Sequence, residues 1–244
     1  MKTLVTGGSR GIGLATALRL AQAGHQTWIA ARGEEQLQAA CRSAADLSLT
    51  PLVMDVADPA SVATGFGQLG PGLDVLVHAA GTGAYSDLLD PEDPAIWQQV
   101  IATNLGGAYH CARAAAALMP AGSRIIFIAS VLGLRGMRHS HAYCASKHGV
   151  IGLMRALAQD LMPRGITVNA ICPGWVETAM ARQDLAAMAS RYALDPQELE
   201  AAEIAAVPLN RWIQPQEVAE LVAYLASPAA AAVTGQALEI SGGL

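Results

Sequence analysis

"TGGSRGIGLATALRLAQAG", residues 6–24, decides the fold, because it joins a short apolar run to an amphipathic helix pattern through a glycine-rich turn. Gly7, Gly11 and Gly13 fall in that turn, where the absence of side chains lets the backbone approach a phosphate group. Backbone N–H groups at a helix N-terminus suit a pyrophosphate. The stretch therefore predicts the first strand, the first helix and a dinucleotide site between them, although a plain glycine-rich turn would also explain the spacing.

Short apolar, β-branched runs alternate with helix-length segments along the rest of the chain. Because these runs are hydrophobic throughout, they are typical of parallel strands buried on both faces and joined by right-handed crossovers. We therefore expect an α/β fold, a Rossmann-type doubly wound parallel sheet of about seven strands with helices on both faces. The expected strands are 3–7, 26–31, 50–56, 73–81, 124–130, 166–174 and 237–243.

Helix signals fill the segments between these strands. Asp58 and Asp93 each precede a proline, so each can cap a first helical turn. Two longer helices are expected at about 95–118 and 141–161, and a helical excursion at about 180–212 is long enough to be a substrate lid. No repeat or linker interrupts the chain, so residues 1–244 are expected to form a single domain.

Composition excludes several classes of partner. The net charge is −5 and the arginines are scattered, so neither nucleic acid nor an anionic membrane is indicated. Four cysteines lie far apart without a Cys-x-x-Cys motif, which indicates reduced thiols and no metal site. The start has no signal-peptide core, and no apolar run approaches 18 residues, so we expect a cytoplasmic protein with a small-molecule partner.

"HAYCASKHGV", residues 141–150, holds Lys147, one of two lysines, four residues after Tyr143, one of five tyrosines. On a helix these side chains face the same way. An ammonium one turn away favours the phenolate, so we expect Lys147, aided by a cationic nicotinamide ring, to lower the pKa of Tyr143. A surface pair is the plain alternative.

"TGGSRGIG", "NLGGAYH", "IASV" and "YCASK", in this order, resemble the short-chain dehydrogenase/reductase family across the whole chain. The resemblance implies a catalytic tetrad of Asn104, Ser130, Tyr143 and Lys147. In reduction Tyr143 would protonate the carbonyl oxygen as hydride arrives, Ser130 would hydrogen-bond that oxygen, and Lys147 would also bind the nicotinamide ribose. The Tyr-x-x-x-Lys spacing is similar to that of the carbonyl reductases and alcohol dehydrogenases of the family and disfavours double-bond reduction.

Asn104 lies inside the helix expected at 95–118, directly before the helix-weakening glycines of "NLGG". The resemblance implies a distorted turn in which Asn104 binds a water that connects Lys147 with solvent. Glycines that allow close helix packing are the alternative, and both explanations can hold together.

The cofactor is expected to be NADP(H). An acidic residue ends strand two in NAD-binding folds, but here Ala31 is followed by Arg32, and Glu34 and Glu35 belong to the next helix. Arg32 and Arg10 are thus free for a ribose 2′-phosphate. The expected cofactor contacts are Gly7, Ser9, Arg10, Gly11, Ile12, Gly13, Ala31, Arg32, Asp55, Val56, Ala79, Ala80, Gly81, Tyr143, Lys147, Pro173, Gly174, Val176 and Thr178.

Two of these segments are less certain matches. Asp55 could instead be a helix cap. "HAAG" departs from the common Asn-Asn-Ala-Gly of the family, so contacts of those amides are in doubt, and we expect His78 to be structural.

"ARGEEQL", "CPGWVETAM" and "VPLNRWIQPQEVAELVAYLASP" are similar to 3-oxoacyl-thioester reductases and aromatic polyketide ketoreductases, although "GTGAYSDLLD" lacks the glycine pair after proline of many polyketide enzymes. We expect an NADPH-dependent ketoreductase acting on an apolar, acyl-thioester or cyclic ketone. An alcohol dehydrogenase working in the oxidative direction is the alternative, and an intact tetrad argues against a non-catalytic dinucleotide sensor.

Two further expectations concern the lid and the assembly. Leu185, Met188, Tyr192 and Leu194 of the lid indicate either an apolar substrate surface or ordinary helix packing. By analogy with the family, the apolar helices 95–118 and 141–161 are expected to build a homotetramer. The sequence does not select the ketone, its stereochemistry or a carrier protein.

Overall fold

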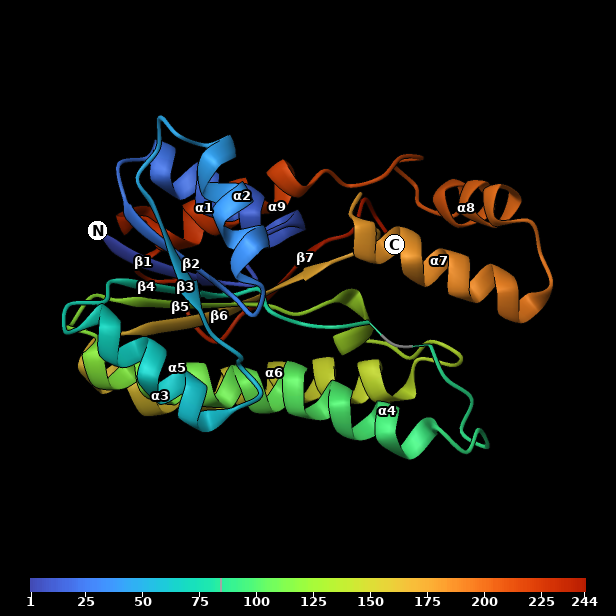
Figure 1. The fold of residues 1–244 in the computed structure, drawn as a ribbon, viewed down its shortest axis with the longest axis horizontal. Coiled ribbons are helices and arrows are strands. Elements are labelled where there is room, and N and C mark those ends of the chain that lie inside the picture. The colour runs from blue at the N-terminus through green and yellow to red at the C-terminus, as the bar shows by residue number, and fades with distance from the viewer. Residues whose placement is uncertain (84) are drawn as a thin grey trace.

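Seven parallel strands form one sheet in the order β3-β2-β1-β4-β5-β6-β7 in the computed structural model, which describes residues 1–83 and 85–244 (Figure 1). The predicted doubly wound parallel sheet is confirmed. The strands are β1 (Lys2–Thr6), β2 (Gln26–Ala31), β3 (Leu49–Val53), β4 (Val75–His78), β5 (Arg124–Ile128), β6 (Thr167–Pro173) and β7 (Ala237–Ile240).

Several strands end earlier than their apolar runs predicted. Beyond β3, Met54 and Val56 are buried although they lie outside the ladder. The chain that turns over the end of a sheet can be buried and as apolar as the strand before it. The apolar runs in the sequence are therefore longer than the strands themselves.

Helices cover both faces of the sheet because successive strand residues point to opposite sides. Leu4 belongs to the core beneath α3 (Pro59–Leu69), α5 (Gly107–Leu118) and α6 (His141–Leu161). Val5 belongs to the core beneath α1 (Gly11–Gln22), α2 (Glu34–Ser43) and α9 (Pro215–Ala226). Figure 1 shows these two layers on either side of the strands. Short 3₁₀ turns η2 (Val131–Gly133), η3 (Met162–Arg164) and η4 (Pro228–Ala230) complete the connections.

The helix expected at 95–118 is divided into three parts. It consists of α4 (Asp93–Val100), a π-helical turn η1 (Ile101–Gly106) and α5. A π turn inside a helix widens the backbone locally and is frequent at functional sites. The conflict that the two glycines introduced into the helical pattern is therefore visible as a distorted turn around Asn104.

One of the two predicted helix caps is wrong. Asp58 caps α3 as expected, accepting a hydrogen bond from the Ala60 N–H at 2.9 Å. Asp93 instead lies within α4 and caps nothing. Its buried Oδ1 accepts from Ser86 Oγ at 2.6 Å and lies 2.9 Å from His141 Nε2. The Asp93 carboxylate therefore binds side chains distant in sequence and does not bind the N–H groups at the start of α4.

The segment predicted as a lid contains α7 (Ala179–Tyr192) and α8 (Pro196–Ala205), which project beyond the end of the sheet (Figure 1). Its role as a lid stays a prediction, and the segment is called the lid below. Leu185 and Met188 are buried with Ala189 and Leu199 in a small core of their own, whereas Leu194 is exposed. Of the two interpretations left open for these side chains, helix packing holds for Leu185 and Met188.

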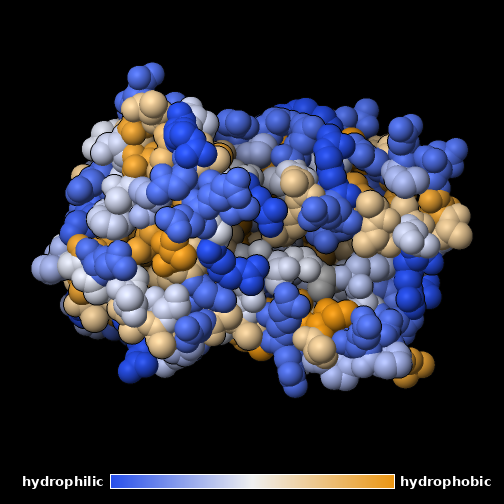
Figure 2. Space-filling model, in the orientation of Figure 1, coloured by the Kyte–Doolittle hydropathy of each residue, from blue (hydrophilic) through white to orange (hydrophobic). Residues whose placement is uncertain are grey.

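The face drawn in Figure 2 is mostly hydrophilic, with hydrophobic side chains in separated patches. Within residues 1–83 and 85–244, no helix is long and apolar enough to cross a membrane.

Candidate active site

The glycine-rich turn lies between β1 and α1, where the order of the strands reverses. Gly7 and Gly11 have φ of +66° and +55°, in the left-handed region that favours glycine. A Cβ placed on Gly7 would lie 2.8 Å from the backbone N of Ala80. The turn therefore presses directly against the chain that leaves β4, and it keeps an open backbone at the start of a helix, as a bound pyrophosphate requires.

The chain after β4 connects this turn with the proposed tetrad. Ala79 N donates to Thr6 O and Ala80 N to Thr6 Oγ, each at 3.2 Å. At Gly81, a Cβ would lie 3.3 Å from Asn104 Oδ1 and 3.6 Å from Lys147 Nζ. Residues predicted from separate motifs are thus brought to one edge of the sheet.

Arg10 and Arg32 border the same edge. Arg10 precedes α1 and Arg32 follows the last residue of β2, Ala31. Both side chains are exposed, and neither forms an ion pair in the described part of the chain. Glu34 and Glu35 open α2, as predicted. The end of β2 therefore presents a cation and no carboxylate.

Asp55 and Val56 follow β3, where the adenine contact was predicted. Asp55 Oδ1 accepts from the Ala57 N–H at 3.0 Å, so the carboxylate closes its own turn and does not cap α3. Val56 is buried against α5, where a Cβ on Gly107 would lie 2.7 Å from Val56 Cγ2. Gly107 thus permits close packing at the distorted turn, as the second explanation offered for the "NLGG" glycines requires.

The segment that begins at the end of β6, residues 173–178, was predicted to contact the nicotinamide end of the cofactor. Gly174 lies against Ser241, whose Cα would be 3.1 Å from an added Cβ. Val176 is buried and forms a parallel bridge with Ile213. Thr178 caps α7 through its Oγ1, and its methyl group would lie 3.4 Å from a Cβ on Gly11. Thr178 therefore brings the end of this segment against the glycine-rich turn.

Ser130, Tyr143 and Lys147 meet at the end of β5. Ser130 Oγ accepts from Leu132 N at 3.1 Å, which leaves its own hydrogen free to donate. Lys147 Nζ donates to Ile128 O at 2.9 Å and lies 5.4 Å from the centroid of the Tyr143 ring. The i, i+4 geometry expected for Tyr143 and Lys147 on one helix is present in α6.

The prediction that neighbouring groups lower the pKa of Tyr143 is wrong as far as the groups of the protein are concerned. Burial raises the pKa of Tyr143 to about 12, and the hydrogen bond with Ser130 only partly opposes this. Burial also lowers the pKa of Lys147 to about 8, so at pH 7 the ammonium form still predominates. The prediction rested on charge and left out desolvation, which disfavours the charged form of both groups. At neutral pH the phenol is protonated and can act as a proton donor.

Asn104 is buried in the π turn η1 and holds the loop after β4 in place. Its Oδ1 accepts from Thr82 N at 2.8 Å, while Nδ2 donates to Thr82 O and to Ser146 Oγ, both at 3.0 Å. The amide therefore ties this loop to α6 beside Lys147. Its role toward a water molecule stays a prediction.

His78 is buried at the end of β4, where its Nδ1 lies 3.1 Å from Thr6 Oγ. Because Thr6 Oγ already accepts from Ala80 N, its own hydrogen can be donated to Nδ1. Burial, followed by the charge of Lys147, lowers the pKa of His78 to about 3. His78 is thus a neutral structural histidine, in agreement with the expectation.

Sequence reasoning missed Asp184, a partly buried carboxylate on α7. A Cβ on Gly83 would lie 2.5 Å from its Oδ1. Burial raises the pKa of Asp184 to about 6, and the charge of Asp184 in turn raises the pKa of Tyr143. No motif pointed to this residue, because its position depends on how the lid folds against the loop after β4.

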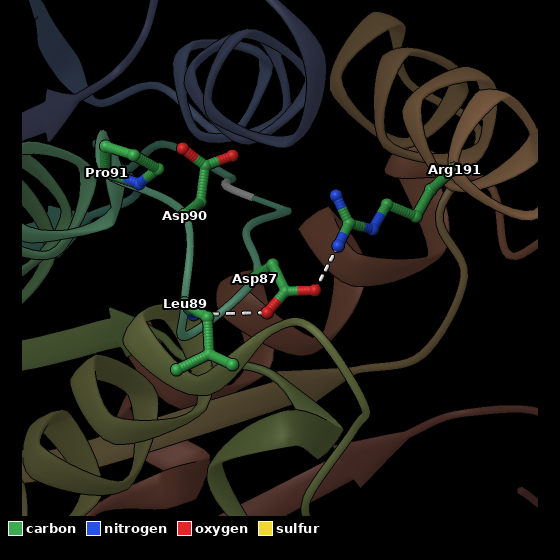
Figure 3. A pocket seen from close by; sticks show the side chains of 5 residues that line it. All are labelled: Asp87, Leu89, Asp90, Pro91 and Arg191. Atoms are coloured by element: carbon green, nitrogen blue, oxygen red, sulfur yellow. Dashed lines mark hydrogen bonds and ion pairs between the residues drawn. The ribbon is translucent and has the colours of Figure 1, made fainter.

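A surface pocket of about 290 Å³ lies at the rim, between the loop before α4 and the last turn of α7 (Figure 3). Arg191 reaches across it from α7 to form an ion pair with Asp87, whose other oxygen accepts from Leu89 N. Asp90 and Pro91 complete the lining. No member of the tetrad lines this pocket, so the chemistry is assigned to the tetrad residues gathered near the end of β5.

Comparisons with known proteins agree with this architecture over the whole chain. A family model described as enoyl-(acyl carrier protein) reductase matches residues 7–244. The ketoacyl reductase of the monensin polyketide synthase from Streptomyces virginiae is 42% identical over 256 residues, covering 99% of this chain and 95% of that protein. The 3-oxoacyl-[acyl-carrier-protein] reductase from Escherichia coli is 36% identical, covering 99% and 96%.

Among solved structures, an actinorhodin polyketide ketoreductase variant with NADPH superposes with a TM-score of 0.90. It is 40% identical, and the match covers 100% of this chain and 96% of that one. The likeness therefore extends to the lid and to both walls of the cleft.

Proposed function

The chain belongs to the short-chain dehydrogenase/reductase family, and on that premise we propose that it is an NADPH-dependent ketoreductase acting on an apolar, acyl-thioester or cyclic ketone. The observation that carries the proposal is the convergence of Asn104, Ser130, Tyr143 and Lys147 beside a glycine-rich turn. The relatives named above as ketoreductases support it.

Carbonyl reduction needs a hydride at carbon and a proton at oxygen, and bound NADPH supplies the hydride. Tyr143 Oη donates the proton, since burial keeps the phenol protonated at neutral pH. Ser130 Oγ accepts from Leu132 N, and its hydroxyl hydrogen, which is directed to Tyr143 in the structure, would donate to the same carbonyl oxygen. Both donors thus favour charge developing on the carbonyl oxygen.

Lys147 compensates the charge left on Tyr143. One ammonium hydrogen is engaged by Ile128 O, so two remain for cofactor ribose hydroxyls and for the phenolate. Asn104 positions the loop that lies against Lys147 Nζ, and we propose that the water bound there returns the transferred proton.

Reduction of a carbonyl is favoured over two other reactions. The matching family model is described as an enoyl reductase, but the three-residue gap between Tyr143 and Lys147 is that of carbonyl reductases. A phenol with a pKa raised to about 12 is protonated at neutral pH, so its proton is available for ketone reduction, whereas alcohol oxidation needs the phenolate as a base.

Two exposed arginines favour NADPH over NADH. Arg32 directly follows β2, where an NAD-binding enzyme carries an acidic residue, and Arg10 directly precedes α1. The structural neighbour solved with NADPH supports this choice. The glycine-rich turn suits a dinucleotide, because its backbone is left open where a Cβ on Gly7 or Gly13 would clash with neighbouring backbone.

We further propose that the enzyme is a cytoplasmic homotetramer. Trp97 on α4 and Tyr109 on α5 are 41% and 46% exposed, on helices expected to pair between subunits. Large exposed aromatic side chains on neighbouring helices suit such a contact.

The test is NADPH consumption by the purified protein with a 3-oxobutanoyl thioester, a tetralone and the corresponding alcohols. We expect both ketones to be reduced, with NADPH preferred to NADH. Turnover confined to alcohol oxidation, or to a conjugated double bond, would contradict the proposal.

A further inference from the structure

Asp184 places a carboxylate on the inner side of the lid. A Cβ on Gly83 would lie 2.5 and 2.6 Å from its two Oδ atoms, so any side chain at that position would push the lid away. Glycine therefore lets the carboxylate of α7 rest directly on the loop after β4.

The same loop touches the catalytic groups. Two residues before Gly83, Gly81 lies against Asn104 Oδ1 and Lys147 Nζ, and Thr82 N donates to Asn104. The charge of Asp184 also acts on the phenol of Tyr143, so the carboxylate lies within electrostatic range of the proton donor. This interaction and the contact with the loop after β4 place Asp184 near the tetrad.

The cations of α7 are turned to other partners. Arg182 pairs with Glu177 and Glu200, while Arg191 pairs with Asp87. Within the two described ranges, no cation forms an ion pair with Asp184. The side chain that follows it, Leu185, is buried in the apolar core of the lid. In such surroundings a hydrogen bond to a carboxylate is strong, and a second negative charge is disfavoured.

We propose that Asp184 determines substrate specificity, its carboxylate accepting a hydrogen bond from a neutral O–H or N–H donor that the ketone carries on its lid side. This inference rests on the proposed ketoreductase function. It predicts a preference for ketones with such a donor and discrimination against ketones with a carboxylate at the same place.

Hydroxytetralones and their methyl ethers are suitable probes, because each pair differs only in the donor hydrogen and a methyl group. A charge-assisted hydrogen bond changes kcat/KM by about 10- to 100-fold, so at least one hydroxytetralone should exceed its ether by about tenfold or more. In Asp184→Asn and Asp184→Leu this ratio should fall to within about threefold. Glu198→Gln removes one exposed negative charge from the same lid and should keep the ratio.

The pH dependence provides a second readout that a structural role would not produce. The ratio in the unmodified enzyme should decline as the pH falls through about 6, where the carboxylate becomes protonated. Lys147 stays charged over this range and Tyr143 stays protonated, so neither group causes the decline. In Asp184→Asn the ratio should be independent of pH.

The outcomes distinguish the proposed ketoreductase function from the proposed role of Asp184. Failure of the unmodified enzyme to reduce any tetralone or 3-oxobutanoyl thioester would overturn the proposed function, and this inference with it. Reduction of these ketones with no preference for any hydroxytetralone, or with a preference that Asp184→Asn and Asp184→Leu both retain, would overturn the inference alone.

Discussion

Replacement of Arg32 by aspartate should convert the cofactor preference of the enzyme. Arg32 directly follows the last residue of β2, is exposed, and has no acidic partner in the described part of the chain. A charge-assisted hydrogen bond to a 2′-phosphate contributes about 1.5 to 3 kcal/mol. Because solvent screens an exposed side chain, we expect the lower end, a loss of about tenfold in kcat/KM for NADPH.

The new carboxylate adds repulsion to this loss. At an assumed separation of about 6 Å in water, each unit of phosphate charge contributes roughly 0.7 kcal/mol, or about threefold. NADH lacks that phosphate, so its kcat/KM should change little or rise. The selectivity for NADPH should therefore fall by about 10- to 100-fold.

Steady-state kinetics with one ketone and both cofactors, at low and at high salt, measures this selectivity. Arg42→Asp makes the same change of charge in the last turn of α2 and serves as the matched control. Equal efficiency of the unmodified enzyme with NADH and NADPH would refute the reasoning, as would an Arg32→Asp enzyme with unchanged selectivity.

Three further predictions concern the cradle, the lid and the assembly. Gly7→Ala should destabilise the protein by about 1 to 3 kcal/mol and weaken NADPH binding, since φ is +66° and the new Cβ would meet Ala80 N at 2.8 Å; urea unfolding within about 0.5 kcal/mol of the unmodified protein would contradict this. Asp184→Asn should raise the free energy of unfolding at pH 8 by roughly 1 to 2 kcal/mol, allowing for partial exposure, because a folded pKa near 6 lies above the ordinary value of 3.8 and ionisation then opposes folding. This gain should shrink as the pH falls from about 6 toward 4, and a constant gain would argue against ionisation as its cause. Light scattering should give the mass of a tetramer at micromolar concentration, and a monomer would exclude the proposed pairing through the Trp97 and Tyr109 helices.

The fold could be predicted from the sequence because its signals are local. A side chain would clash with backbone at Gly7 and Gly13 and would be strained by the positive φ of Gly11, and the continuous apolar runs predicted parallel strands buried on both faces. Strand ends were less predictable, since Met54 and Val56 are buried after β3 has ended. The distorted turn around Asn104 was detectable because two glycines contradict the helix around them.

The predictions that were wrong, and the residue that was missed, depend on contacts between residues distant in the sequence. Asp93 has the pattern of a helix cap, but Ser86 and His141 hold its carboxylate in the folded chain. The spacing of Tyr143 and Lys147 indicates a neighbouring charge but not the burial that shifts both pKa values. Asp184 belongs to no motif and becomes a candidate only when the lid is placed over Gly83.

Replacement of Tyr143 by phenylalanine, with turnover and NADPH binding measured separately, tests the central claim most directly. The hydroxyl group is the only part of the side chain removed, and Lys147 keeps its hydrogen bond to Ile128 O. We predict that kcat for ketone reduction falls by about 10²- to 10⁴-fold, the usual contribution of general acid catalysis, while the Kd for NADPH stays within about threefold. A Tyr143→Phe enzyme that retains its turnover would contradict the assignment of Tyr143 as the proton donor.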